Sequence, residues 1–118
     1  MRILESYKHF GDMRGEFLGI INDGRWEEIN YVETESGQVR GGHYHADTQE
    51  LFFIIEGDIE IQVVSIDGRS IQKFTAQKGY IFVVEPLEVH IFKCLTRSKW
   101  INVLSKRMDD NKPDFHRA

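Results

Sequence analysis

Apolar residues along the chain occur in short runs separated by turn residues, and no stretch shows a helical apolar stripe of convincing length. The strongest run, LFFII at 51–55, is typical of a strand that is buried on both faces. At 59–66 apolar and polar residues alternate, as in a half-buried strand, and Asp67-Gly68 then marks a hairpin turn. Further strands are predicted at 17–21, 25–35, 70–76, 80–84, 89–95 and 100–105.

Many short strands spaced by turn residues predict an all-β sandwich or barrel with no substantial helix. The length of 118 residues suits one domain with one hydrophobic core. We therefore expect a single domain over residues 1–118, with residues 1–16 as an N-terminal arm and the charged residues 106–118 as a surface tail.

Two histidines and a glutamate stand close together in the sequence, and a third histidine lies on a later predicted strand. In a strand, His43 and His45 point to the same side, and Glu50 reaches that side from the next strand. His90 adds a third imidazole. Three nitrogens and one carboxylate suit zinc, iron, nickel or manganese better than calcium or magnesium, which prefer oxygen ligands. The sequence predicts one divalent metal per chain at these residues.

The spacing of this stretch resembles the first motif of the cupin superfamily, G-x5-H-x-H-x4-E-x6-G. The residues that carry the resemblance are Gly37, His43, His45, Glu50 and Gly57. The second cupin motif is matched in part, because Gly79 and His90 keep its separation whereas Cys94 replaces its Asn. The resemblance implies a jelly-roll β-barrel in which His43, His45, Glu50 and His90 are the metal ligands.

A narrower resemblance covers almost the whole chain. FGDMRG at 10–15 and RGGH at 40–43 resemble the F-x-D-x-R-G and R-G-x-H signatures of the deoxysugar-epimerase-like (RmlC-like) cupins. This group includes dTDP-4-dehydrorhamnose 3,5-epimerase and nucleotide-sugar 3,4-ketoisomerases. RGGHYHADTQELF at 40–52 is similar to the C-terminal cupin domain of the bifunctional capsular-polysaccharide enzyme that makes a UDP-deoxysugar precursor. The resemblance implies zinc as the favoured metal and a nucleotide-linked 4-keto-deoxysugar as substrate.

One departure from the rhamnose epimerases affects the expected mechanism. Their motif is R-G-x-H-x-Q, and its His acts as a general base without a metal, whereas His45 stands here in place of the Gln. A metal-bound His43 has donated its lone pair and cannot abstract a proton at the same time. His43 is therefore a candidate base only if no metal is bound.

Strand alternation also predicts the surroundings of the metal. Phe52 and Phe92 fall on the same faces as two of the ligands, which predicts a pocket with apolar walls. Glu88, on the same face as Phe92, is a candidate acid or base. Arg40, and more loosely Lys93, are candidates to meet the pyrophosphate of a nucleotide sugar, for which the forked guanidinium is well suited.

Charge and composition narrow the partners. A formal net charge of −4 argues against a surface that binds nucleic acid or an anionic membrane. A single cysteine excludes an intrachain disulfide, and no signal-like segment or apolar run of about 18 residues is present, so we expect a cytoplasmic protein. Apolar side chains on the outer face of the strongest strand, Phe53 and Ile55, predict a homodimer.

Three functions remain open from the sequence. The first is a metal-dependent cupin that epimerises or isomerises a nucleotide-linked keto-deoxysugar in polysaccharide biosynthesis. The second is an iron-dependent cupin dioxygenase, because an open iron site would activate dioxygen. The third is a non-catalytic cupin whose metal is structural and whose barrel binds a sugar or a partner protein.

Overall fold

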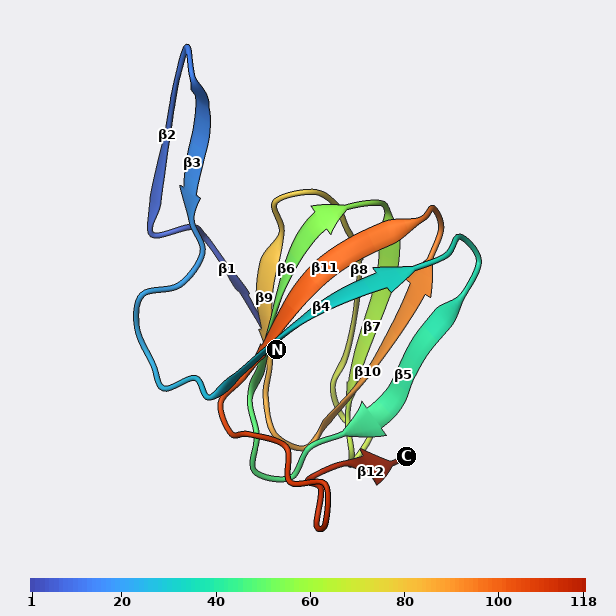
Figure 1. Cartoon of the computed structure of the whole chain (residues 1–118). Coiled ribbons are helices and arrows are strands. Elements are labelled where there is room, and N and C mark those ends of the chain that lie inside the picture. Colours follow the sequence, from blue (N-terminus) through green and yellow to red (C-terminus); the bar gives the residue numbers. More distant parts are fainter.

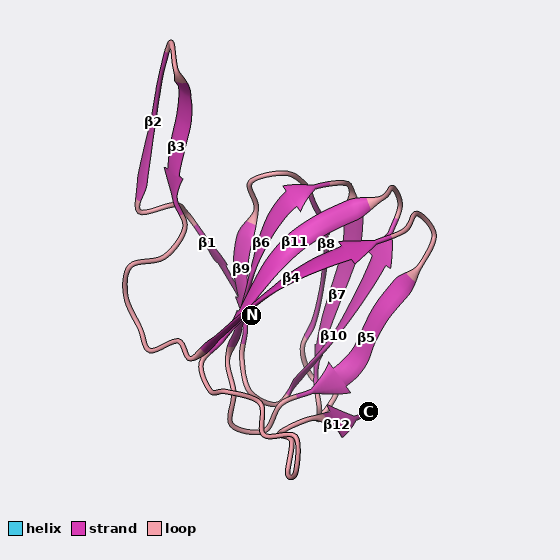
Figure 2. Ribbon diagram, in the orientation of Figure 1, coloured by secondary structure: helices cyan, strands magenta, loops and turns pink.

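Two five-stranded sheets and a separate two-stranded hairpin make up the chain, and there is no helix (Figures 1 and 2). The computed structural model describes residues 1–118. The first sheet has the order β1 (Arg2–Leu4), β9 (Ile81–Val84), β6 (Glu50–Glu56), β11 (Ser98–Leu104) and β4 (Glu28–Thr34). The second has the order β12 (His116–Arg117), β5 (Val39–Tyr44), β10 (Glu88–Cys94), β7 (Ile59–Ser65) and β8 (Ile71–Ala76). The hairpin is β2 (Lys8–Asp12) and β3 (Gly15–Gly19).

All strand pairs are antiparallel, and the two sheets face each other as a jelly roll, which confirms the predicted all-β class. The strands follow the apolar pattern with small shifts at their ends. The strand predicted at 17–21 is Gly15–Gly19, and the one predicted at 25–35 begins only at Glu28. Such shifts are expected because the pattern marks buried positions and not the backbone pairing that ends a strand.

The core lies between the two sheets, and the strongest apolar run contributes to both sides of its own sheet. Phe52 and Ile54 of β6 point inward and are buried together with Phe92 of β10 and Trp100 of β11. Leu51, also fully buried, packs in a smaller cluster on the outer side of the first sheet. The inner face of the run at 51–55 is therefore buried, whereas on its outer face Leu51 is buried and Phe53 and Ile55 are only half-buried, so the predicted burial on both faces holds in part.

The two ends of the chain behave differently. The β2–β3 hairpin projects away from the sheets (Figure 1), and its facing rings Phe10 and Phe17 stack on each other at a centroid distance of 5.0 Å while both remain exposed. The charged tail is largely exposed, but its last residues return to the body, where β12 pairs with the end of β5 (Figure 2). No helix is present that could span a membrane.

Candidate metal and ligand site

A bulge in the pairing of β5 with β10 brings the first histidine into the site. His43 lies opposite His90, but the next pair is Gly41 with Ile91, so one extra residue is accommodated in β5. Gly41 has a φ of +106°, and a Cβ at this position would overlap the carbonyl oxygen of His90. Only glycine fits this backbone without a shift, so Gly41 sets the distance between the two histidine-bearing strands.

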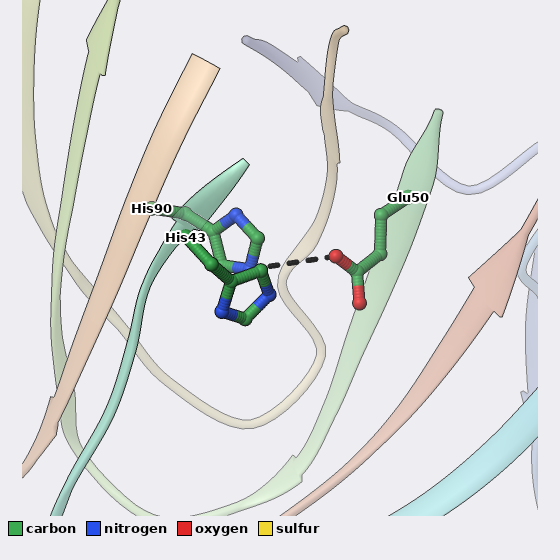
Figure 3. Close-up of side chains that lie close together, drawn as sticks. All are labelled: His43, Glu50 and His90. Carbon is green, nitrogen blue, oxygen red and sulfur yellow. Dashed lines mark ion pairs between the residues drawn. The ribbon is translucent and has the colours of Figure 1, made fainter. Parts of the chain in front are cut away.

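Three of the four predicted ligands form one compact group. The ligand atoms of His43, Glu50 and His90 lie within 4.8 Å of one another (Figure 3). Glu50 extends from β6 of the first sheet toward the two histidines of the second sheet, and its Oε1 lies 3.4 Å from Nε2 of His90. The fourth residue, His45, is outside this group, but its Nε2 lies 3.2 Å from the same Oε1 of Glu50.

The two contacts of Glu50 Oε1 have the separations expected around a bound transition metal. Ligands that lie about 2.1 Å from zinc are about 3.4 Å apart in a tetrahedral shell and about 3.0 Å apart in an octahedral one. The contacts of Glu50 Oε1 with His45 and His90 fall in this range. His45, Glu50 and His90 are buried, and a buried carboxylate requires a compensating cation or proton. The residues present therefore suit a metal with nitrogen and oxygen ligands.

Electrostatics favour unprotonated ligands at two of the three imidazoles. Burial lowers the pKa of His90 to about 4 and also lowers the pKa of His43. For Glu50, burial acts to raise the pKa, but hydrogen bonding by His45 and the nearby imidazoles outweigh it, so the pKa is lowered. Burial acts to lower the pKa of His45, and its bonds to Glu50 and Asp114 raise it overall. Neutral His43 and His90 keep their lone pairs available beside an ionised carboxylate.

Asn102 is a site residue that the sequence analysis missed. Its amide nitrogen donates a hydrogen bond to Oε2 of Glu50, which leaves Oε1 of that carboxylate facing the histidines. Its own Oδ1 is buried without a partner, as is Nδ1 of His90. An asparagine within the apolar strand WINVL was the signal that could have pointed to it.

A cavity of about 120 Å³ opens beside this group. Its lining combines apolar and polar side chains, as in a small-molecule site. The lining residues are Val32, Arg40, Gly41, His43, Glu50, Phe52, His90, Phe92, Trp100 and Asn102. Phe52 and Phe92 thus line the cavity beside the predicted ligands.

Of the three charged residues predicted to act on the substrate, only Arg40 lines the cavity. Arg40 lines the cavity, and its guanidinium donates to Thr34 Oγ1 at 2.7 Å and to a backbone carbonyl at 3.1 Å, which leaves other N–H groups for a ligand. Glu88 does not line the cavity, because its carboxylate pairs with the terminal ammonium of Met1 at 2.6 Å. Lys93 is exposed and lines a separate depression on the outer side of the second sheet, as strand alternation from Phe92 requires.

The tail supplies two more neighbours that the sequence did not indicate. The Nδ1 atom of His45 lies 2.5 Å from the backbone carbonyl oxygen of Asp114. The ring of Phe115 stacks on His43 with a centroid distance of 4.3 Å and an interplanar angle of 28°. The tail therefore contacts two of the four predicted ligands.

Comparisons with known proteins agree with this architecture. The sequence matches the family described as "Polysaccharide biosynthesis C-terminal domain" over residues 10–114. No curated protein sequence matches the chain. Among solved structures, a 3,4-ketoisomerase from Helicobacter canadensis has a TM-score of 0.85 at 18% identity, covering 99% of this chain and 90% of the other. A dTDP-4-dehydrorhamnose 3,5-epimerase from Elizabethkingia anophelis has a TM-score of 0.81 at 18% identity, with 98% and 73% covered.

The capsular polysaccharide assembling protein CapF from Staphylococcus aureus has a TM-score of 0.71 at 19% identity, and 98% of this chain is covered. The chain spans 34% of the length of that protein. The two facing antiparallel sheets form a jelly roll with a histidine-and-carboxylate group between them, and the 3,4-ketoisomerase and 3,5-epimerase structures share this fold. The chain belongs to the polysaccharide biosynthesis C-terminal domain family.

Proposed function

We propose that this chain is a metal-dependent cupin that epimerises or isomerises a nucleotide-linked 4-keto-deoxysugar in polysaccharide biosynthesis. The observation that carries the proposal is the group His43, Glu50 and His90, which lies beside a cavity with apolar walls and one arginine. The family description and the 3,4-ketoisomerase and 3,5-epimerase structures support this class of reaction.

His43, His45, Glu50 and His90 would hold the metal, with zinc favoured and iron, nickel or manganese as alternatives. A bound metal with an open position would supply a Lewis acid for the keto oxygen, which stabilises the charge that develops when the neighbouring carbon loses its proton. Phe52 and Phe92 line the cavity and would shield that carbon from water, and the hydrogen bond from Asn102 holds Glu50 in place.

The cavity is too small for a whole nucleotide sugar, so only part of the proposed substrate would enter it. A volume of about 120 Å³ holds only a small group. The reacting end of the sugar would enter it, and the nucleotide would remain outside. Arg40 lines the cavity and is itself exposed, and it would bind the pyrophosphate between them.

A metal-free reaction is the second candidate, and the state of His43 favours it. This imidazole is half-buried and its pKa is lowered by burial, so at neutral pH it is unprotonated and able to accept a proton from carbon. Metal content and activity therefore have to be measured together.

The experiment is elemental analysis of the purified wild-type protein and of Glu50→Gln. Glu60→Gln is the control, because Glu60 is exposed on the outer face of β7, away from the core. We expect one metal in wild type and control and a large loss in Glu50→Gln. Equal stoichiometry in all three would refute the ligand assignment.

The reaction is tested with 4-keto-deoxysugar nucleotides in deuterated water. The proposal is supported if deuterium is incorporated at the carbon next to the ketone and if this incorporation stops when the metal is removed. Incorporation that is independent of metal and abolished in His43→Ala supports the metal-free candidate. Oxygen consumption that requires ferrous iron would instead support the dioxygenase, and a metal without any turnover would support the non-catalytic cupin.

We also propose that the protein acts as a homodimer, with a second copy covering the outer side of the first sheet. That side carries exposed Ile29 and Tyr31 on β4. An apolar depression of about 310 Å³ runs from the base of the hairpin across Phe53 and Val103. Contiguous apolar surface of this kind is typical of an interface between protein chains.

A further inference from the structure

The end of the tail is fastened to the turn that joins the metal-binding strands. The carboxylate of Asp114 accepts hydrogen bonds from the backbone N–H groups of Ala46 and Asp47, at 2.8 and 2.9 Å, and from Thr48 Oγ1 at 2.8 Å. These three donors lie between His45 and Glu50 in the sequence. One side chain of the tail therefore holds the segment that carries two of the proposed ligands.

The backbone of the same residue determines which nitrogen of His45 carries the proton. A carbonyl oxygen only accepts, so the 2.5 Å contact with Asp114 requires a proton on Nδ1 of His45. In the neutral ring, Nε2 then has a free lone pair, and it faces Oε1 of Glu50 at 3.2 Å. Two such acceptors repel unless a cation or a proton lies between them, and this is the arrangement that two ligands of one metal require.

The neighbouring tail residue restrains the other histidine of the motif. Phe115 stacks on His43 and meets His45 edge-on at a centroid distance of 6.3 Å. Arg117 lies over the ring of Phe115 at 5.6 Å, and β12 pairs with β5 beside it. His43 is only half-buried, so without this ring its imidazole would have more rotational freedom.

We propose that Asp114 and Phe115 are positioning residues of the metal site: Asp114 fixes the tautomer and orientation of His45, and Phe115 restrains His43. The proposal rests on the metal site of the proposed function. It assigns to the tail a role in metal affinity and not in the chemical step, because neither side chain lines the cavity.

The test compares Asp114→Ala with Asp110→Ala, which removes the same charge from an exposed residue of the same tail. Zinc affinity is measured by competition with a chromophoric chelator. The tautomer of His45 is measured in metal-free protein at alkaline pH, where the ring is neutral, from the 15N shifts of its ring nitrogens. We expect Asp114→Ala to bind zinc about 10- to 100-fold more weakly, which is typical of losing such an outer partner, and Asp110→Ala to match wild type. The carboxylate anchors the backbone whose carbonyl accepts from Nδ1, so its loss releases that carbonyl. His45 should therefore shift from the Nδ1-protonated form toward the other tautomer only in Asp114→Ala.

Phe115→Ala should also weaken zinc binding, and Phe115→Tyr should restore it. If Asp114→Ala does not fold, Asp114→Asn provides the comparison, since it keeps the size of the side chain while losing an acceptor. Equal zinc affinity and an unchanged His45 tautomer in the Asp114 variant and in Asp110→Ala would overturn the proposal. If wild type binds no metal, the proposed function fails, but the His45 tautomer in metal-free protein still decides the role of the tail.

Discussion

Adjacent glycines in β5 provide a controlled test of how the site is assembled. Gly41 and Gly42 both have positive φ, +106° and +79°. A Cβ on Gly41 would overlap the carbonyl oxygen of His90 and lie 3.1 Å from the Cα of Ile91, whereas a Cβ on Gly42 would meet nothing within 4 Å. Alanine at 42 therefore introduces backbone strain alone, and alanine at 41 adds a collision with the strand that carries His90.

The expected free energies follow from this difference. Gly42→Ala should destabilise the protein by about 1–2 kcal/mol, the cost of a left-handed backbone for alanine. Gly41→Ala should cost about 3–4 kcal/mol, because the strain is joined by overpacking that only a movement of the bulge can relieve. That movement separates His43 from His90, so metal binding should weaken more than stability alone explains.

The assay is urea unfolding of wild type and both variants in metal-free form, followed by zinc titration of the folded proteins. Similar unfolding free energies for the two variants, with zinc affinity retained in Gly41→Ala, would show that the close approach at Gly41 does not position the histidines.

Three further predictions concern other parts of the structure. Asn102→Leu should weaken zinc binding about 10-fold, because Glu50 loses the donor that orients it, and an unchanged affinity in a competition titration would contradict this role. Burial acts to raise the pKa of Asp114, but its hydrogen bonds lower it to about 2, so its stabilisation is present above about pH 4 and is lost as the pH falls through about 2. The unfolding free energy of wild type should exceed that of Asp114→Asn by about 1 kcal/mol at pH 7, and the difference should vanish near pH 2. The neighbouring histidines are common to both proteins, so their titration cancels in the comparison. A difference that persists at pH 2 would contradict the assignment. Ile29→Asp should shift a dimer to monomer in sedimentation, whereas Ile71→Asp, at a similarly exposed position on the other sheet, should not; a shift in both or in neither would exclude the proposed face.

Much of the fold and part of the candidate site could be predicted from local pattern. The period of two along a strand is a local property, so it placed Phe52 beside Glu50 and Phe92 beside His90 correctly. The same rule, applied strictly, turns Lys93 outward, and the structure shows it on the outer side of the second sheet. Apolar runs and turn residues were enough to indicate the number and class of most strands.

Contacts between distant segments could not be predicted in this way. Asn102 meets Glu50, and Asp114 meets the turn after His45, across more than 50 residues of sequence. Glu88 shares a strand face with His90, yet its carboxylate forms an ion pair with the terminal ammonium of Met1. No local pattern records which strands become neighbours or where a polar tail returns.

Local pattern was sufficient for the all-β class, the jelly-roll resemblance and the four residues proposed as metal ligands. The folded chain was needed to show that Gly41 sets the spacing of the histidines and that Asn102 orients the carboxylate. It alone brought Asp114 and Phe115 onto His45 and His43. The physical reason is that side-chain alternation depends on neighbouring residues, whereas the shape of a site depends on which distant strands pair and in which register.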